Sequence, residues 1–443
     1  MGRPCSLLFV PFALFALSPA VRPAAAQAPS GEETRRAHTM LQLIRDDLKK
    51  YYYDSTFGGT DLDRRVREAD AAIDQAVTLN EQLAGIAQFV LDFHDSHTFF
   101  LPPGRAADVD YGWAWTSVGA NCFVDTVMKG SDAERQGLRP GDQVLTIDGI
   151  ALNRQSSFVA YYVYNALSPR RGMHVQLQHP DGTAYEVDIQ AKVTPRPRVV
   201  DYSDMSTWSF LLTRMEDESH ARRHFWREFG DTVLVWHFGE FVSDDQGIDD
   251  MMERAAGHKN LIIDLRNNGG GSEEAITRLI GHFIDHPQRI ARLPRRAKTD
   301  SLVAKPRGKA PYHGNVFVLV NANSASASEV TARFLQLEGY ATVVGDRSMG
   351  AVISADIVAH DVGFQKFITF GLEVTVQDVV MNDGERLENK GVTPEWIVVP
   401  TGADMAARRD PQMTKALALA GIQLDPALAA KIYDKDFART RGS

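Results

Sequence analysis

Apolar residues repeat every three or four positions near the start of the chain. Leu41, Ile44 and Leu48 form one such series. A repeat of this period places apolar side chains on one face of a helix. Pro102-Pro103-Gly104 then interrupts the pattern. The pattern predicts an N-terminal helical unit over residues 33–106.

Short apolar runs alternate with amphipathic segments between residues 200 and 399. Buried strands are expected at 233–238, 261–265 and 315–320, and helices at 247–256, 273–284 and from 329 onward. Two later strands are expected at 367–370 and 374–379. The alternation predicts a layered α/β core over residues 200–399. The tail, residues 400–443, has a helical pattern and is expected to pack on this core.

The middle of the chain, residues 108–199, has a β-rich pattern. Its segment 127–149 reads as a strand, a short helix, a glycine turn and a second strand that ends at Asp148-Gly149. This segment resembles the core of a PDZ domain, a module that binds extended peptides by adding them to a sheet edge. The segment Gly112-Trp113-Ala114-Trp115 departs from the usual carboxylate-binding loop. A spacer that binds nothing is therefore the alternative.

The N-terminus carries a targeting pattern. Arg3 precedes an apolar run over 7–17, and Ala24-Ala25-Ala26 offers a cleavage site of small residues. The run is too short, and too interrupted by proline, for a membrane span. The pattern predicts a secretory signal peptide over residues 1–26, with an uncleaved anchor as the alternative. We expect export to a periplasm or the cell surface.

Charge and cysteine usage exclude some classes of function. The net charge of −9 gives no electrostatic basis for binding nucleic acid. Removal of the signal peptide would take Cys5 with it and leave Cys122 as the only cysteine, so neither an intrachain disulfide nor a cysteine metal site is expected. The histidines show no His-Glu-x-x-His spacing. We expect no metal and no cofactor.

A serine-rich corner, Asn323–Glu329, lies between the predicted strand at 315–320 and the helix that follows it. Such a corner exposes a hydroxyl and directs backbone N–H groups outward, which suits a nucleophile and an oxyanion hole. A plain serine helix cap is the alternative. The loop Arg266–Gly271 follows the neighbouring strand, and its three glycines allow close approach of backbone to a ligand. Both are expected at the crevice where α/β sheets bind ligands.

Four segments together resemble the serine peptidases of the C-terminal processing (tail-specific) protease and tricorn-core family. They are 261–271, 324–329, 344–346 and 388–394. The resemblance implies a layered α/β, ClpP/crotonase-like peptidase core with an N-terminal helical unit and an inserted PDZ-like β-rich domain. By position it implies that Ser326 is the nucleophile. It also implies that the N–H groups of Ala327 and Gly270 form the oxyanion hole.

The chain departs from the Ser/Lys branch of that family. The lysine of that branch lies in a turn 25 residues after the serine, and here that position is Ala351, which accepts no proton. The tricorn-like branch lacks the lysine and uses a Ser-His-Ser-Glu tetrad. Ser96-His97 matches its Ser-His pair, and Glu388 matches its glutamate. The resemblance implies His97 as general base, oriented by Glu388 directly or through Ser96.

Four further residues have open or structural roles. His94 is the alternative base, one helical turn from His97 if the segment is helical. Glu329 caps the helix after the corner or positions Ser328. Asp264 and Arg266 are expected to be structural.

The expected function is that of an exported serine endopeptidase that cleaves peptides or C-terminal segments of proteins through an acyl-enzyme. Because Ala351 replaces the lysine, a non-catalytic relative that binds peptides or apolar ligands is the alternative. A latent enzyme that peptide switches on at the PDZ-like unit is a third reading. The oligomeric state stays open.

Overall fold

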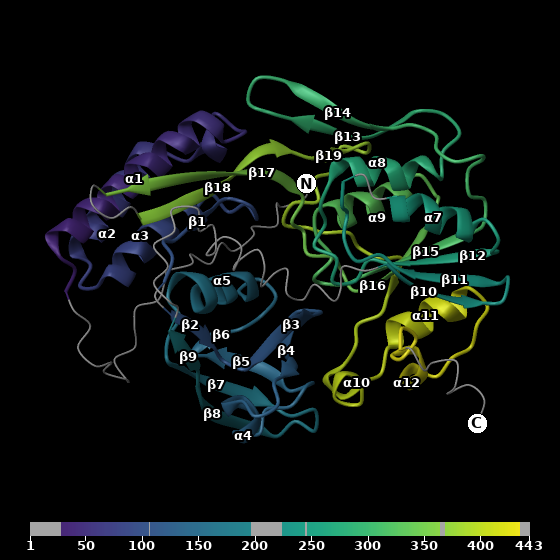
Figure 1. Ribbon diagram of the computed structural model, residues 1–443, viewed down its shortest axis with the longest axis horizontal. Coiled ribbons are helices and arrows are strands. Elements are labelled where there is room, and N and C mark those ends of the chain that lie inside the picture. The colour runs from purple at the N-terminus through teal and green to yellow at the C-terminus, as the bar shows by residue number, and fades with distance from the viewer. Residues whose placement is uncertain (1–27, 106, 196–223, 244–245, 364–367, 435–443) are drawn as a thin grey trace, which may run out of the picture.

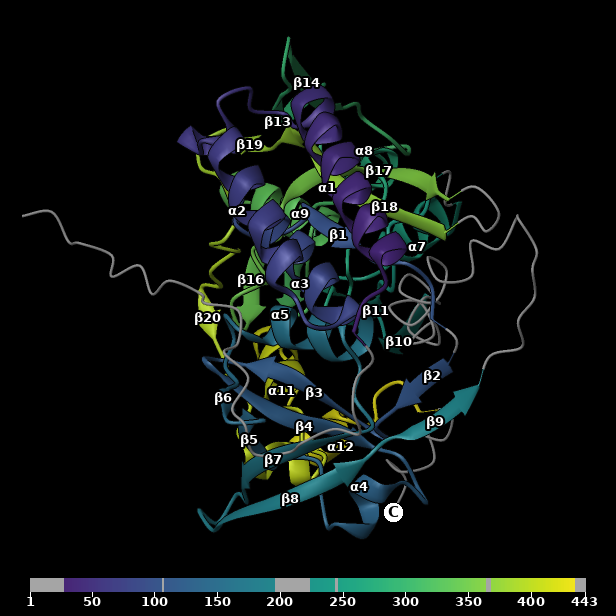
Figure 2. The same ribbon diagram turned by 90° about the vertical axis from the view of Figure 1, so that its left-hand side faces the viewer.

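A computed structural model of the chain describes residues 28–105, 107–195, 224–243, 246–363 and 368–434. The predicted signal peptide, residues 1–26, lies outside these residues. Helices α1–α3 lie at one end of the molecule and a larger α/β part lies at the other (Figure 1). A β-rich part lies below the helices, as the turned view also shows (Figure 2).

A six-stranded sheet of order β10-β11-β12-β15-β16-β20 forms the centre of the α/β part. Its strands are β10 (Phe225–Phe229), β11 (Val233–His237), β12 (Asn260–Asp264), β15 (Asn315–Val320), β16 (Thr342–Gly345) and β20 (Trp396–Ile397). Only β10 runs antiparallel to its neighbour, and the pairs from β11 to β20 are parallel. The strands predicted at 233–238, 261–265 and 315–320 are confirmed as β11, β12 and β15.

Helices cover both faces of this sheet (Figure 1). They are α7 (Gln246–Ala255), α8 (Glu273–Gly281) and α9 (Ala327–Leu337) on one face, and α11 (Pro411–Leu419) and α12 (Pro426–Ala429) on the other, with α10 (Gly402–Ala406) between β20 and α11. Along β12, Leu261 and Ile263 pack toward α7–α9, whereas Ile262 packs with Met413 and Leu417 of α11. Successive strand residues point to opposite faces, so a strand buried on both sides is a continuous apolar run. The α/β architecture and the helical tail agree with the sequence pattern.

The N-terminal helices do not form a core by themselves. Helices α1 (Gly31–Tyr51), α2 (Leu62–Gln75) and α3 (Leu79–Leu91), with a 3₁₀ turn η1 (Phe57–Gly59), pack against a three-stranded sheet of order β1-β18-β17. Its strands are β1 (Phe99–Leu101), β17 (Ile353–Val362) and β18 (Ile368–Asp378). Phe100 and Phe370 are fully buried where this sheet meets the helices. A hairpin from late in the chain thus completes the N-terminal core.

Two predicted elements differ from the structure. The expected strands at 367–370 and 374–379 are one strand, β18, paired with both β1 and β17. The helical pattern expected up to residue 106 ends with α3, because β1 takes residues 99–101 into the sheet. In both places strand pairing with a distant segment overrides the local pattern.

The β-rich part has a sheet of order β3-β4-β5-β7-β8, with β6 paired to β5. Its elements are β2 (Ala107–Asp110), β3 (Trp113–Val118), β4 (Asn121–Val127), α4 (Asp132–Arg135), β5 (Gln143–Ile147), β6 (Ile150–Ala151), α5 (Ser157–Tyr162), a π-helical turn η2 (Val163–Leu167), β7 (Gly172–Gln178), β8 (Ala184–Gln190) and β9 (Lys192–Pro195). The predicted strand, short helix, turn and strand are β4, α4 and β5. A further sheet, β14-β13-β19, comprises β13 (Gln288–Pro294), β14 (Thr299–Ala304) and β19 (Val380–Met381).

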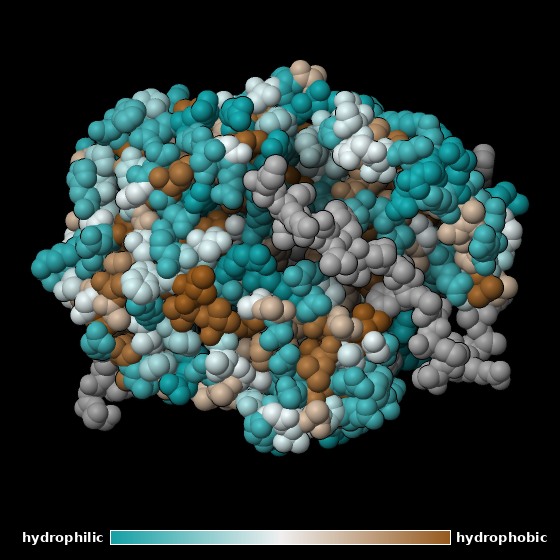
Figure 3. Space-filling view, turned by 180° about the vertical axis from the view of Figure 1, so that it is seen from behind, coloured by the Kyte–Doolittle hydropathy of each residue, from teal (hydrophilic) through white to brown (hydrophobic). Residues whose placement is uncertain are grey.

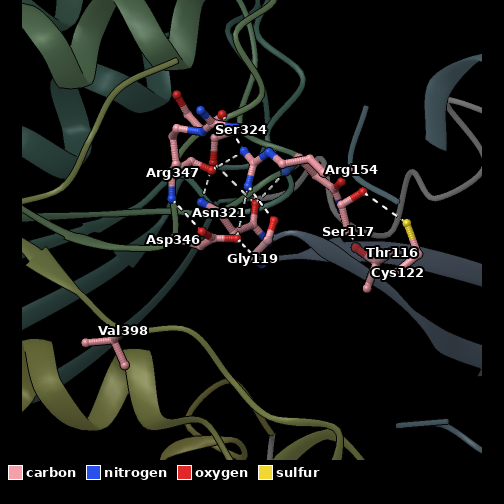
Figure 4. A network of polar contacts seen from close by, with 12 residues as sticks. Thr116, Ser117, Gly119, Cys122, Arg154, Asn321, Ser324, Asp346, Arg347 and Val398 are labelled. Atoms are coloured by element: carbon pink, nitrogen blue, oxygen red, sulfur yellow. Dashed lines mark hydrogen bonds and ion pairs between the residues drawn. The ribbon is translucent and has the colours of Figure 1, made fainter. Parts of the chain in front are cut away.

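A buried ion pair joins the β-rich part to the α/β part (Figure 4). Arg154 Nη1 lies 3.2 Å from Asp346 Oδ2, and both side chains are less than a tenth exposed. Arg154 Nη2 donates to the carbonyl oxygens of Arg347 and Ser348, and Gly119 N donates to Asp346 Oδ2. These contacts fix the β-rich part against the loop after β16.

A glycine contact forms a second junction. A Cβ atom on Gly141, whose φ is +93°, would lie 2.2 Å from the carbonyl oxygen of Gly402 in α10. Only glycine permits this approach between the turn before β5 and the C-terminal tail.

The surface in Figure 3 is mostly hydrophilic, with hydrophobic residues gathered in small patches. In the part of the chain that the structure describes, no helix combines the length and apolar character that crossing a bilayer requires. Cys122 is buried in the β-rich part, with Sγ 3.6 Å from Ser117 Oγ.

Candidate active site

Ser326 lies at the sharp corner between β15 and α9, as the sequence predicts. Its φ of +52° is in the left-handed region, which a residue with a side chain rarely adopts. The backbone N–H of Ser326 donates to the carbonyl oxygen of Ala351 at 2.8 Å and to Glu329 Oε2 at 3.1 Å. A strained serine held at a strand-to-helix corner is typical of a nucleophile.

The triple-glycine loop after β12 contacts this corner. A Cβ on Gly270 would lie 2.6 Å from Ser326 Cβ and 2.9 Å from Ala327 N, so only glycine fits there. The predicted oxyanion residues, Gly270 and Ala327, therefore lie side by side next to Ser326. The Gly270 N–H donates to Asn268 Oδ1 at 2.9 Å in this structure. The oxyanion role predicted for Gly270 therefore requires this bond to open.

Ser96, His97 and Glu388 form one hydrogen-bonded group. Ser96 Oγ lies 2.7 Å from His97 Nδ1 and 3.0 Å from Glu388 Oε2. The Ser96 backbone N–H donates to Glu388 Oε1 at 2.8 Å, across 292 positions of sequence. Val352 N donates to Glu388 Oε2 at 2.8 Å. The structure thus brings together three of the predicted site residues from opposite ends of the chain.

The donors and acceptors in this group determine which ring nitrogen of His97 carries a proton. Ser96 has one hydroxyl proton, and an ionised Glu388 only accepts. When Ser96 Oγ donates to Glu388, it accepts from a protonated His97 Nδ1. The other ring nitrogen, Nε2, then carries the free lone pair that a general base needs.

Burial tunes both titratable groups. Desolvation raises the pKa of Glu388 to about 7, against the hydrogen bonds from Val352 and Ser96, which lower it. Desolvation lowers the pKa of His97, so its ring is neutral near pH 7. Solvent reaches Glu388 through a cavity of about 320 Å³, also lined by Tyr53, Asp95, Ile353, Asp378, Gly384, Glu385, Arg386 and Lys390.

Among the described residues, which include both side chains, the structure has no hydrogen bond between His97 and Oγ of Ser326, the predicted nucleophile. Hydrogen bonds of catalytic groups are often long without substrate and tighten in the complex. The pairing of His97 with Ser326 therefore stays a prediction.

His94, the alternative base, occupies a different environment. The segment after α3 is not helical, and His94 has a φ of +55° and an exposed side chain. Its carbonyl oxygen accepts a bond from Asn389 Nδ2 at 3.0 Å. The structure joins His97, and not His94, to Glu388 through Ser96.

Asp264 and Arg266 form a buried ion pair at 2.7 Å. Arg266 also contacts Asp410 at 2.8 Å and Gln412 at 3.3 Å. The pair ties the end of β12 to α11, so both residues are structural, as expected.

Sequence reasoning missed two residues that support the site. Asn268 is fully buried, donates to Phe238 O, and accepts bonds from Ala325 N and Ser328 Oγ through its carbonyl oxygen. Asp95 accepts bonds from the His97 backbone N–H and from the hydroxyls of Tyr52, Thr98 and Thr375. Asp95 lies next to Ser96 in the sequence, and Asn268 lies two residues before Gly270. This proximity was the signal available in the sequence.

Comparison with family models assigns two parts of the chain. Residues 232–398 match the model of peptidase family S41, and residues 109–157 match that of the PDZ domain. The matches fall inside the α/β part and the β-rich part.

The chain is also similar to curated proteins. It is 23% identical over 270 residues to carboxy-terminal processing protease CtpA of Bacillus subtilis (strain 168), covering 60% of this chain and 51% of that protein. It is 23% identical over 325 residues to a probable CtpA-like serine protease of Staphylococcus aureus (strain N315), covering 70% of this chain and 59% of that protein. The chain thus spans between half and three fifths of the length of these relatives.

Among solved structures, the crystal structure of mature CPAF matches with a TM-score of 0.66 at 14% identity, covering 92% of this chain and 99% of that one. A structure of mature CPAF complexed with lactacystin matches with a TM-score of 0.65. The similarity extends over the helical, PDZ and α/β parts and establishes a shared fold. Residues 232–398 form a peptidase family S41 domain, and a PDZ domain precedes it in the chain.

Proposed function

We propose that this protein is a serine endopeptidase that acts through an acyl-enzyme. The hydrogen-bonded group of His97, Ser96 and Glu388 carries the proposal, because it supplies a base where Ala351 supplies none. In this respect the chain follows the tricorn-like branch rather than the Ser/Lys branch. The C-terminal processing activity named for its relatives supports the same class of reaction.

The proposed reaction begins when His97 Nε2 takes the proton of Ser326 Oγ. The oxygen attacks the scissile carbonyl carbon, and the N–H groups of Ala327 and Gly270 bind the resulting oxyanion. His97 then donates its proton to the leaving amine, and water hydrolyses the ester by the same steps. Glu388 stabilises the charged histidine through Ser96.

Labelling with a fluorophosphonate probe tests the assignment. We expect labelling and casein hydrolysis in the wild type, and a fall of at least about 10³-fold in both for Ser326→Ala and for His97→Ala. His94→Ala is the matched control and should keep near-wild-type activity. Full labelling in His97→Ala would refute the base, and hydrolysis by Ser326→Ala would refute the nucleophile.

The alternative is a non-catalytic binder on the same scaffold. Two observations favour it: Ala351 occupies the lysine position, and the Gly270 N–H is already bonded to Asn268. A binder would show no labelling of Ser326 with or without added peptide. Labelling that appears only with peptide present would instead support a latent enzyme.

We propose that the PDZ domain captures the extended C-terminal segment of a substrate at the outer edge of β3, which pairs with no second strand among the described residues. This strand ends the order β3-β4-β5-β7-β8 and lies beside α5, where Trp115 Nε1 donates to Ser157 Oγ at 3.1 Å. Strand addition at such an edge is the common PDZ binding mode. Fluorescence anisotropy with a peptide and its C-terminally amidated form tests the site. Equal affinity for the two would contradict carboxylate capture.

Export is proposed from the pattern over residues 1–26 alone. N-terminal sequencing of the protein from the periplasmic or secreted fraction should start near Gln27. A cytoplasmic protein that retains residue 1 would contradict the proposal.

A further inference from the structure

Glu329 is a buried acid that the proposed mechanism does not use. It is the third residue of α9 and is fully buried. Its carboxylate accepts four hydrogen bonds. Oε1 accepts from Ser348 Oγ at 2.5 Å and from Gly350 N at 2.7 Å. Oε2 accepts from Ala351 N at 2.9 Å and from Ser326 N at 3.1 Å. One carboxylate therefore contacts both the Ser326 corner and the turn that contains Ala351.

The same turn, residues 348–352, is bonded on its other side to the loop that carries Glu388. Val392 N donates to Ser348 Oγ at 2.5 Å, and Asn389 N donates to Gly350 O at 2.7 Å. Val352 N donates to Glu388 Oε2 at 2.8 Å. The turn thus lies between the proposed nucleophile and the proposed acid, with hydrogen bonds to both.

We propose that Glu329 is a positioning residue, which fixes Ser326 against turn 348–352 and thereby sets the spacing between Ser326 and the Ser96–His97–Glu388 group. In Ser/Lys relatives this turn presents the lysine; here it presents Ala351 and acts as a spacer. The inference rests on the proposed role of Ser326 as nucleophile.

Only a carboxylate satisfies all four donors. A glutamine side chain at 329 would have nearly the same shape, but its NH₂ group would face two of the four donors. Those two buried donors would then lose their acceptor. Ser326 holds its left-handed backbone with two bonds from its N–H, one to Glu329 and one to Ala351 O. Loss of the first lets the corner relax toward an ordinary helix cap and moves Oγ away from His97.

The test compares Glu329→Gln with Glu274→Gln, a substitution of an exposed acid in the first turn of α8. In peptide hydrolysis we expect Glu329→Gln to lower kcat by about 10- to 100-fold, because a shift of about 1 Å in the position of the attacking oxygen can slow the reaction by that factor. KM should stay within about twofold of the wild-type value. Fluorophosphonate labelling should slow by the same factor. Glu274→Gln should match the wild type.

A second variant covers the case in which Glu329→Gln fails to fold. Ser348→Ala removes one donor to Glu329 and the acceptor for Val392 N, and should lower kcat in the same direction by a smaller factor. The double variant should lose less than the product of the two factors, because both act on one network. Glu329→Asp should recover part of kcat.

Three outcomes would overturn the positioning role: wild-type kcat in Glu329→Gln, a change confined to KM, or multiplicative losses in the double variant. Failure of the proposed function is a separate result. It appears as hydrolysis that survives Ser326→Ala, or as no labelling in the wild type.

Discussion

Proton transfer at the site depends on three neighbouring side chains whose protonation states are linked. In the proposed mechanism, His97 acts as a base only while its Nδ1–H donates to Ser96, and Ser96 donates in turn only to an ionised Glu388. Desolvation raises the pKa of Glu388 to about 7 and lowers that of His97. The carboxyl group of Glu388, rather than the imidazole, is therefore the last group to lose its proton as pH rises.

The pH profile of hydrolysis follows from this order. As pH falls through about 7, Glu388 takes up a proton, the relay loses its acceptor, and kcat should decline. Glu388→Gln should lower kcat. The fall of kcat on the acid side of its pH profile should then move to lower pH, where His97 with its lowered pKa takes up a proton. Initial rates from pH 5 to 9 measure both, with Glu274→Gln as control. An unchanged acid limb in Glu388→Gln would contradict the relay.

Several site residues could be identified from the sequence, and their contacts could not. Ser326, Ser96, His97 and Glu388 lie in short motifs, so their positions were predictable. The bond of Gly270 N to Asn268, and the four bonds to Glu329, depend on loops that meet only in the folded chain. Glu329 was expected to cap α9 or to position Ser328. It does bond the Ser326 N–H at the helix start, but Ser328 bonds Asn268 instead.

At the level of elements, turn 348–352 has a tight steric requirement beside the loop that carries Glu388. Gly350 has a φ of +83°, and a Cβ there would lie 2.9 Å from Lys390 N and 3.0 Å from Gly391 N. Gly384 has nearly the same φ, +84°, with nothing within 4 Å. A side chain would therefore strain the backbone equally at both positions, but only at Gly350 would it also clash with neighbouring atoms.

Gly350→Ala should therefore lower kcat by about 10-fold or more, because it pushes the Glu388 loop away from the turn. Gly384→Ala should cost only the strain, about 1 kcal/mol of unfolding free energy, with kcat unchanged. Paired kinetics and urea denaturation separate the two effects. Equal kcat values for the two variants would refute the spacer role of the turn.

Elements of the α/β sheet were predictable because burial on both faces gives long apolar runs. The continuity of β18 was not, because Gly371 and Glu373 interrupt the apolar pattern between the two predicted strands. In the structure Gly371 pairs with Leu101, and Glu373 pairs with Phe99. These partners lie about 270 positions earlier in the sequence, beyond the reach of a local pattern.

For the whole molecule, buried polar contacts join the PDZ domain to the α/β part. The ion pair between Arg154 and Asp346 lies at this junction, next to the turn that contacts Glu329 (Figure 4). Nothing in the sequence pattern pairs these two residues, since each lies in a loop of a different part.

Removal of one partner should be costly. Arg154→Met leaves Asp346 buried without its cation, and should lower the free energy of unfolding by about 3–5 kcal/mol. Arg135→Met breaks the exposed pair with Asp132 on α4 and should cost about 0–1 kcal/mol. Urea denaturation monitors the effect, and limited proteolysis reports whether the PDZ domain separates. Equal losses for the two variants would contradict a structural role for the junction.

The bond between Ser96 and Glu388 also bears on how the protein is made. These residues lie 292 positions apart, and β1 pairs with β18 over a similar distance. A chain that is still emerging from the ribosome has its histidine but neither Ser326 nor Glu388 until most of its length is synthesised. If Ser326, His97 and Glu388 act as proposed, the nascent protein cannot digest its neighbours, and hydrolysis begins only once β18 has paired with β1.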